Sequence, residues 1–235
     1  MRVGAMLPSF RHGSEEALAT ARAAEAAGID AVFCFDHLWP MGQPERPALA
    51  AFPLLAAVAA STERLSVGTL VARIGLVPDE MLLARFATLA AVAPGRVIAG
   101  LGTGDAKSFA ENDAYGIPAD PPAERRSALA RCARELRDAG LPVWVGAGGR
   151  PTNDLARELG VALNLWGASP EAVAAHAASG EVTWAGPPVT SGDAEAIAAV
   201  LRPIADAGAT WAVLGSPTPV DALAEAAAAL RGGPS

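Results

Sequence analysis

The sequence predicts an α/β fold, specifically a (β/α)₈ TIM barrel, with one domain over residues 1–235. Three observations lead to this prediction. Eight short apolar runs alternate with eight alanine-rich helical stretches along the chain. Several runs, including 31–35 and 97–101, are almost continuously apolar, which is typical of parallel strands buried on both faces. The length is close to the roughly 250 residues that such a barrel usually has. A doubly wound open sheet is the alternative.

The expected strands are apolar runs that end at glycine, proline or polar residues. In chain order they lie near residues 2–7, 31–36, 65–72, 96–102, 142–147, 161–166, 181–186 and 210–215. A helix is expected after each strand, and these helices lie near residues 14–27, 48–60, 78–92, 124–138, 152–159, 169–179, 193–207 and 218–230.

Helix-end signals support these boundaries. Ser14 is a suitable N-cap, and the acids Glu15 and Glu16 follow it in the first turn. Gly28 and Gly140 come directly after two of the helices, where the chain needs a positive φ. Two polar stretches, 40–47 and 105–122, are too long for simple turns. Both follow the carboxyl ends of expected strands, where a barrel builds its active site.

Composition excludes several classes of protein. Eighteen Lys and Arg residues against 25 Asp and Glu residues give a net charge of −7, and only 18% of residues are charged. We therefore expect neither a disordered chain nor a nucleic-acid-binding protein. No apolar run is long enough to span a membrane, and no signal segment is evident, so a cytoplasmic protein without a membrane partner is expected. The alanine-rich, weakly charged helices suggest a homodimer.

Two cysteines, Cys34 and Cys132, lie far apart and in no paired motif, which indicates neither disulfides nor a thiolate zinc site. Asp36 and His37 directly follow the second expected strand. One histidine beside one carboxylate is a poor metal site, so no bound metal is expected. An imidazole at the carboxyl rim of a barrel is well placed to carry a proton. The alternative is that Asp36 caps a turn on which His37 packs.

Two glycine clusters are candidate ligand sites. The run 100–105 (GLGTGD) is not a dinucleotide fingerprint, because Asp105 stands where G-x-G-x-x-G needs its last glycine. Its glycines allow a flat or phosphorylated ligand to approach the backbone, with Thr103 and Ser108 as hydroxyl donors. The alternative is a structural turn.

The second cluster, 146–153, ends the fifth expected strand and begins a helix. Backbone amides at a helix start, Gly148, Gly149 and the cation Arg150 together form a plausible phosphate site, and a structural turn is again the alternative. Among the tryptophans, Trp39 and Trp166 are expected to face a pocket. There is no G-x-S-x-G or P-loop motif to support a hydrolase or NTPase function.

Taken in order, the segments 24–33 (AEAAGIDAVF) with 36–39 (DHLW), 66–71 (SVGTLV), 96–104 (RVIAGLGTG) and 143–149 (VWVGAGG) resemble the bacterial luciferase-like superfamily. The resemblance covers about residues 1–166. Asp-His after the second strand and Gly-Thr-Gly-Asp after the fourth are most similar to the branch that uses the deazaflavin coenzyme F420. The resemblance implies a luciferase-like barrel that passes a hydride between deazaflavin C5 and a small organic substrate.

The resemblance also implies roles for individual residues. Asp36 would contact the deazaflavin and His37 would lie near C5. A cis peptide bond at Leu70-Val71 would lie behind the ring. Thr103, Gly104 and Ser108 would bind the ring edge and the polar tail, while Gly148, Gly149 and Arg150 would receive the phosphate. Asp105 stands where F420-dependent sugar-phosphate dehydrogenases place a catalytic glutamate, although its side chain is shorter.

The chain also departs from the family pattern. It is shorter than typical members and lacks the long insertions that roof the substrate pocket after the fourth and seventh strands. Two other functions therefore remain possible at this stage. One is an FMN-dependent monooxygenase of the same fold, and the other is a cofactor-binding protein without turnover.

Overall fold

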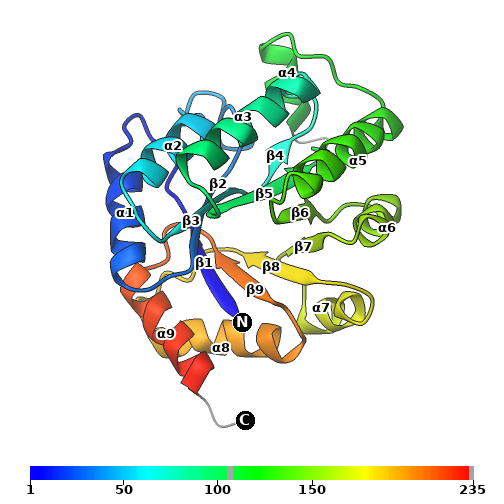
Figure 1. Cartoon of the computed structure of the whole chain (residues 1–235). Helices are drawn as coiled ribbons and strands as arrows, with labels where there is room; N and C mark the ends of the chain where they lie inside the picture. The colour runs from blue at the N-terminus through cyan, green and yellow to red at the C-terminus, as the bar shows by residue number, and fades with distance from the viewer. Residues whose placement is uncertain (105–107, 233–235) are drawn as a thin grey trace.

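Parallel strands close into a barrel surrounded by helices (Figure 1). The computed structural model describes residues 1–104 and 108–232. Within them the strand order is β3-β2-β1-β9-β8-β7-β6-β5-β4, and β3 also pairs with β5, which completes the ring. The described strands are β1 (Arg2–Met6), β2 (Ala31–Cys34), β3 (Ser66–Thr69), β4 (Ala72–Arg73), β5 (Val97–Gly102), β6 (Val143–Gly146), β7 (Ala162–Trp166), β8 (Val182–Gly186) and β9 (Trp211–Leu214).

The predicted TIM barrel is confirmed and the open-sheet alternative is wrong. Where one strand is expected near 65–72, the structure has two, β3 and β4, and both pair with β5. Between them the Leu70–Val71 peptide bond is cis, as the resemblance implies. The two short strands together occupy the third of the eight barrel positions.

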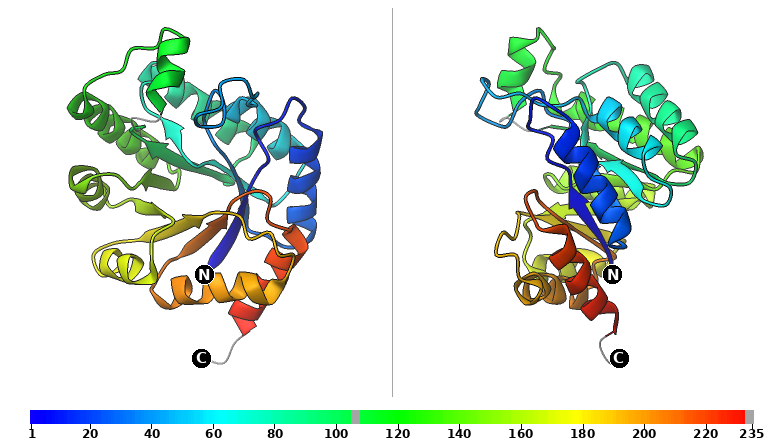
Figure 2. Two further views of the ribbon diagram at one scale, coloured as in Figure 1. Left: turned by 180° about the vertical axis from the view of Figure 1, so that it is seen from behind. Right: turned by 90° about the vertical axis from the view of Figure 1, so that its left-hand side faces the viewer.

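The helices lie outside the strands, as the two views of Figure 2 show. Those described are α1 (Glu15–Ala26), α2 (Ala51–Ala60), α3 (Asp79–Val92), α4 (Phe109–Ala114), α5 (Pro122–Asp138), α6 (Arg150–Leu159), α7 (Pro170–Ala177), α8 (Ala194–Asp206) and α9 (Val220–Gly232). The sequence predicts eight of them to within a few residues, but it does not predict α4. Gly28 and Gly140 have φ of 79° and 85°, as expected. Ser14 stands at the N-cap of α1, but its side chain makes no capping hydrogen bond.

Aromatic side chains fill the interior of the barrel. Phe33 of β2 is fully buried and stacks on Trp144 of β6 with ring centroids 5.0 Å apart. Trp211 of β9 meets Trp144 at 5.4 Å, edge to face. A second and larger apolar cluster lies between the strands and the helices. The barrel is therefore a packed core, and only its rim is free to build a site.

The structure bears on several further expectations from the sequence, with different outcomes. Trp39 is buried and its ring packs 5.8 Å from Tyr115, so it does not face a pocket as expected. Cys34 and Cys132 are free thiols, and burial raises the pKa of each to about 12. No helix in the described residues is long and apolar enough to cross a membrane. The homodimer stays a prediction.

The contact between the third barrel position and β5 generates a test of the fold. A Cβ atom at Gly100 would clash with the backbone oxygen of Thr69, which cannot rotate away. We expect Gly100→Ala to destabilise the protein by about 3 kcal/mol or to prevent folding, because overpacking that displaces backbone is costly. Thermal or urea unfolding would measure the change.

Gly180→Ala is the matched control, because a Cβ there meets nothing within 4 Å. Equal stability of the two variants would contradict the close approach at Gly100.

Candidate active site

Most of the predicted site residues lie along one arc of the barrel rim. Strands β2, β3 with β4, β5 and β6 are successive neighbours in the sheet. Because they run parallel, their carboxyl ends meet at one rim. Asp36 and His37 follow β2, Leu70 and Val71 lie between β3 and β4, Thr103 and Gly104 follow β5, and Gly148 and Gly149 follow β6. Asp105 lies outside the described residues.

Asp36 is a buried carboxylate with one backbone donor. Asp36 is 8% exposed, and its Oδ2 accepts a hydrogen bond from the backbone N–H of Arg73 at 3.2 Å. Burial raises the pKa of Asp36, and the hydrogen bond from Arg73 together with the charges of Arg73 and Arg85 offsets the rise only in part. A carboxylate with a raised pKa at the rim of a barrel is typical of a functional group.

His37 is held by a residue that the sequence analysis does not identify. Glu111 of α4 is fully buried, and its Oε1 lies 2.7 Å from His37 Nδ1. Its Oε2 accepts hydrogen bonds from the backbone N–H of Leu38 at 2.8 Å and from Arg73 Nη2 at 3.1 Å. One carboxylate thus binds the segment after β2 and the end of β4 at the same time.

Arg73 ties the same network to the segment after β5. Its Nη1 donates to the backbone oxygen of Ser108 at 3.3 Å and to Asn112 Oδ1 at 3.2 Å. Ser108, which the resemblance implies as a cofactor contact, is buried. Arg73 could have been suspected from the sequence, since it follows the apolar residues 70–72 at the carboxyl end of a strand. Glu111 could not, because several acids share its loop.

Thr103 and Gly104 are fixed by a second arginine. Nη1 of Arg125 in α5 donates to the backbone oxygen of Thr103 and, at 3.2 Å, to that of Gly104. Gly104 has φ +69°, which glycine adopts without strain. The guanidinium of Arg125 also lies 5.4 Å from the ring of Phe109. The carbonyls of Thr103 and Gly104 therefore face α5.

Gly149 is the N-cap of α6, as the sequence suggests for a phosphate site. Its φ of −67° is open to any residue, and an added Cβ would meet only Pro151 Cδ at 3.7 Å. The backbone N–H of Gly148 donates to Asn153 Oδ1 at 3.0 Å. Arg150 extends into solvent, 92% exposed, with Nε 3.5 Å from Asp154 Oδ2. The expected role of Arg150 at a phosphate stays a prediction.

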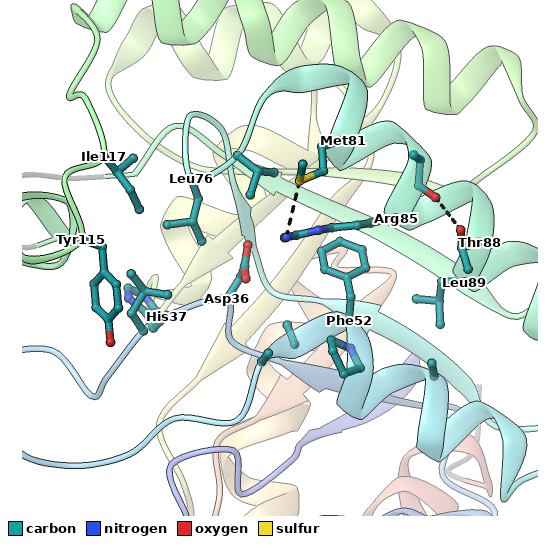
Figure 3. Close-up of a pocket in the computed structure, with 17 residues that line it drawn as sticks. Asp36, His37, Phe52, Leu76, Met81, Arg85, Thr88, Leu89, Tyr115 and Ile117 are labelled. Carbon is teal, nitrogen blue, oxygen red and sulfur yellow. Dashed lines mark hydrogen bonds between the residues drawn. The ribbon is translucent and has the colours of Figure 1, made fainter.

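A cavity of about 590 Å³ lies beside Asp36 and His37 (Figure 3). Its walls come mainly from α2, α3 and the segment that follows β4, with Tyr115 and Ile117 beyond α4. Figure 3 shows the Asp36 carboxylate between the side chains of His37 and Arg85. The lining is largely apolar, and none of the predicted glycine contacts belongs to it. Asp36 and His37 therefore line this cavity without the glycine turns.

An aromatic group lies over the rim next to His37. The ring of Phe35 stacks on Phe10 at 5.7 Å and lies 5.8 Å from Trp166 and 6.4 Å from the His37 ring. Trp166 ends β7 and is 51% exposed, and its expected place at a pocket stays a prediction. Within residues 1–104 and 108–232, no three His, Cys, Asp or Glu side chains gather in a metal-binding group.

Comparison with known protein families assigns the chain to one of them. The family model described as luciferase-like monooxygenase matches residues 1–136, more than half of the chain. The chain belongs to the luciferase-like monooxygenase family. This assignment agrees with the barrel, with the rim position of Asp36 and His37, and with the cis bond at Leu70–Val71.

Individual relatives in this family carry more specific names. The chain is 38% identical over 147 residues to an F420-dependent glucose-6-phosphate dehydrogenase of Beutenbergia cavernae, which is 62% of this chain and 42% of that protein. It is 34% identical over 116 residues to an F420-dependent hydroxymycolic acid dehydrogenase of Mycobacterium tuberculosis, covering 48% of this chain and 32% of the relative. The matches thus span less than half the length of these curated relatives.

A solved structure resembles the whole barrel. An F420-dependent secondary alcohol dehydrogenase, in complex with an F420-acetone adduct, superposes with a TM-score of 0.83. The alignment covers 98% of this chain and 99% of that one at 17% identity, a level that supports the shared fold alone.

The burial of Asp36 leads to a prediction about stability and pH. Its pKa is raised in the folded protein, so the ionised form opposes folding above that pKa and the protonated form does not. We expect Asp36→Asn, which keeps an oxygen for the Arg73 N–H, to raise the melting temperature at pH 7. The gain over wild type should shrink as the pH falls toward the ordinary Asp pKa of 3.8.

Thermal unfolding of both proteins at several pH values would measure this difference. The contributions of the other titrating groups are common to both proteins and largely cancel in the comparison. A gain that grows at low pH would show that the sign is wrong.

Proposed function

We propose that the protein is an oxidoreductase that uses coenzyme F420 and transfers a hydride between the deazaflavin and a small organic substrate. The observation that carries the proposal is the arrangement at the end of β2, where Asp36 is buried and His37 is held by Glu111 beside the cavity. F420-dependent relatives at 34–38% identity over 116 to 147 residues support the choice of cofactor.

The residues present are compatible with a flat, anionic cofactor. Phe35 and the half-exposed Trp166 offer an aromatic surface at the rim. In the described part of the chain, Nε of Arg73 and Nε of Arg125 are buried without a hydrogen-bond partner, and both arginines border a cavity of about 20 Å³ with Thr103 and Gly104. A cavity of this volume holds about one water molecule, so these donors can receive a single small acceptor and not the cofactor ring.

Gly149 adds a second point of fit. Nothing in the folded chain requires glycine there, because the backbone conformation is ordinary and an added Cβ finds only a normal contact. A phosphate can approach the first turn of α6 closely where position 149 carries no side chain. In this proposal Gly148 and Gly149 receive the phosphate, and the exposed Arg150 adds charge at the edge.

When bound, the deazaflavin supplies hydride chemistry at its C5 carbon. The protein orients the reactants and handles the proton. Nδ1 of His37 is engaged by Glu111, so Nε2 is the atom left to exchange a proton with substrate. For an alcohol, Nε2 would take the hydroxyl proton as the C–H bond breaks, and for a carbonyl it would return it. Asp36 and the Thr103–Gly104 turn would contact the cofactor.

A titration of the apoprotein with F420 and, separately, with FMN tests the cofactor. We expect F420 to bind with a change in its fluorescence and FMN to bind far more weakly. The same samples, given reduced or oxidised F420 and a panel of small alcohols, aldehydes and ketones, should show consumption of the cofactor with at least one of them.

The other two functions give different results in this experiment. Tight FMN binding without F420 binding would favour a monooxygenase. F420 binding without turnover of any substrate would favour a cofactor-binding protein. Either result would contradict the proposal.

The phosphate position makes a prediction of its own. We expect Gly149→Asp to raise the dissociation constant for F420 about tenfold or more, because a carboxylate near the phosphate repels it by about 1–4 kcal/mol. Fluorescence titration would measure the constant.

Gly180→Asp is the matched control, since it adds the same charge at an open glycine in the α7–β8 connection, at the opposite end of the barrel. An unchanged constant in Gly149→Asp would refute the placement of the phosphate.

A further inference from the structure

The buried side chain of Glu111 forms hydrogen bonds through both carboxylate oxygens, and the two oxygens have different partners. Oε1 meets a single partner, His37 Nδ1 at 2.7 Å. Oε2 meets two donors, the backbone N–H of Leu38 at 2.8 Å and Arg73 Nη2 at 3.1 Å. The Glu111 side chain has no solvent exposure, and that of Arg73 is 6% exposed. The guanidinium therefore supplies the countercharge, and the imidazole can be neutral.

The chemistry of these partners determines which nitrogen of His37 carries the proton. A carboxylate only accepts hydrogen bonds, so the contact at Nδ1 requires a proton on that nitrogen. In the neutral ring Nε2 then has a lone pair. In the described part of the chain Nε2 has no hydrogen-bond partner.

We propose that Glu111 is a positioning residue that keeps His37 in the Nδ1–H tautomer and leaves Nε2 to exchange protons with the substrate. The proposal deepens the proposed function, because it rests on His37 as the group that handles the proton. It assigns to Glu111 a role that neither the sequence motifs nor the rim position of Asp36 and His37 indicates.

A purely structural role for Glu111 accounts for the contacts less well. Arg73 has two further acceptors, the Ser108 carbonyl and Asn112 Oδ1, so it does not depend on Glu111 alone. The contact to His37 is shorter than the contact to Arg73, 2.7 Å against 3.1 Å. The Phe35 ring, 6.4 Å from the imidazole and inclined by 63°, bounds the His37 ring on another side. The ring orientation is thus set by several contacts at once.

The asymmetry of Glu111 allows a sharp test with Glu111→Gln. The amide oxygen of glutamine should take the place of Oε2, where it satisfies the Leu38 and Arg73 donors together. The amide NH₂ group must then face His37 Nδ1. Because that group is a donor, Nδ1 has to accept the hydrogen bond and cannot carry the proton. We therefore expect this variant to move the proton of the neutral ring from Nδ1 to Nε2.

Nitrogen-15 NMR of the histidine side chains in the apoprotein, recorded above the pH at which the ring signals stop changing, reports the tautomer of the neutral ring directly. The signals of His37 are identified by their loss in His37→Ala. We expect Nδ1–H in wild type and Nε2–H in Glu111→Gln. The proposal is overturned by Nε2–H in wild type, a measurement that needs no variant to fold, or by an unchanged tautomer in a folded Glu111→Gln protein.

Kinetics provide the second readout. In Glu111→Gln we expect kcat to fall about 10- to 100-fold, the range for a catalytic group held in the wrong geometry, while the KM for F420 changes less than about twofold. Asp113→Asn is the matched control, because it removes the same charge from an exposed position on α4. A variant in which KM rises and kcat holds would contradict the positioning role.

The two proposals fail in different ways. If the apoprotein neither binds nor consumes F420, the proposed function fails, and the tautomer measurement on the apoprotein still decides whether Glu111 sets the proton on His37. If F420 is turned over but the wild-type ring carries its proton on Nε2, the positioning role fails and the proposed function stands.

Discussion

The buried ion pair between Arg73 and Glu111 is the constraint on which the rest of the site depends. Removing two charges from water costs several kcal/mol, so such a pair persists only when its remaining donors and acceptors are satisfied. Here the partners are His37, Leu38, Ser108 and Asn112, which come from the segments after β2 and after β5. The short helix α4 and the rim of β2 therefore take their positions from one network. A substitution that displaces Arg73 at the end of β4 would therefore alter the position of His37 through Glu111, although Arg73 and His37 are not bonded to each other.

The barrel follows from local patterns, and its irregular parts do not. Residues 65–72 form one apolar run, so the pattern predicts one strand, and nothing in it marks the break between β3 and β4. Helix α4 has only six residues and no apolar periodicity, and Glu111 in its middle is buried by contacts with distant strands. Tertiary contacts rather than helix propensity determine this segment, which explains why the sequence does not predict it.

The same distinction separates the site residues. Asp36 and His37 are predictable because they directly follow a strand, and the geometry of a parallel barrel brings every such position to the rim. Glu111 lies in a long loop with several other acids, and the order of the strands does not determine where a loop residue goes. The geometry of the strands does not determine the direction of Arg150 either. This residue follows two glycines at a helix start, and its side chain extends into solvent beside Asp154, so its expected phosphate contact stays a prediction.

Asp36 and Glu111 are two buried carboxylates within the same small region, and the protein treats them differently. Glu111 has a guanidinium and two further donors, so its charge is compensated inside the protein. Asp36 has one backbone donor at 3.2 Å and more distant cations, and burial raises its pKa. A ligand that donates a hydrogen bond to Asp36 would replace the water that burial removes, and would gain more there than at a compensated carboxylate. The incomplete pairing of Asp36 agrees with its place in the lining of the cavity, whereas Glu111 is compensated within the protein and contacts His37.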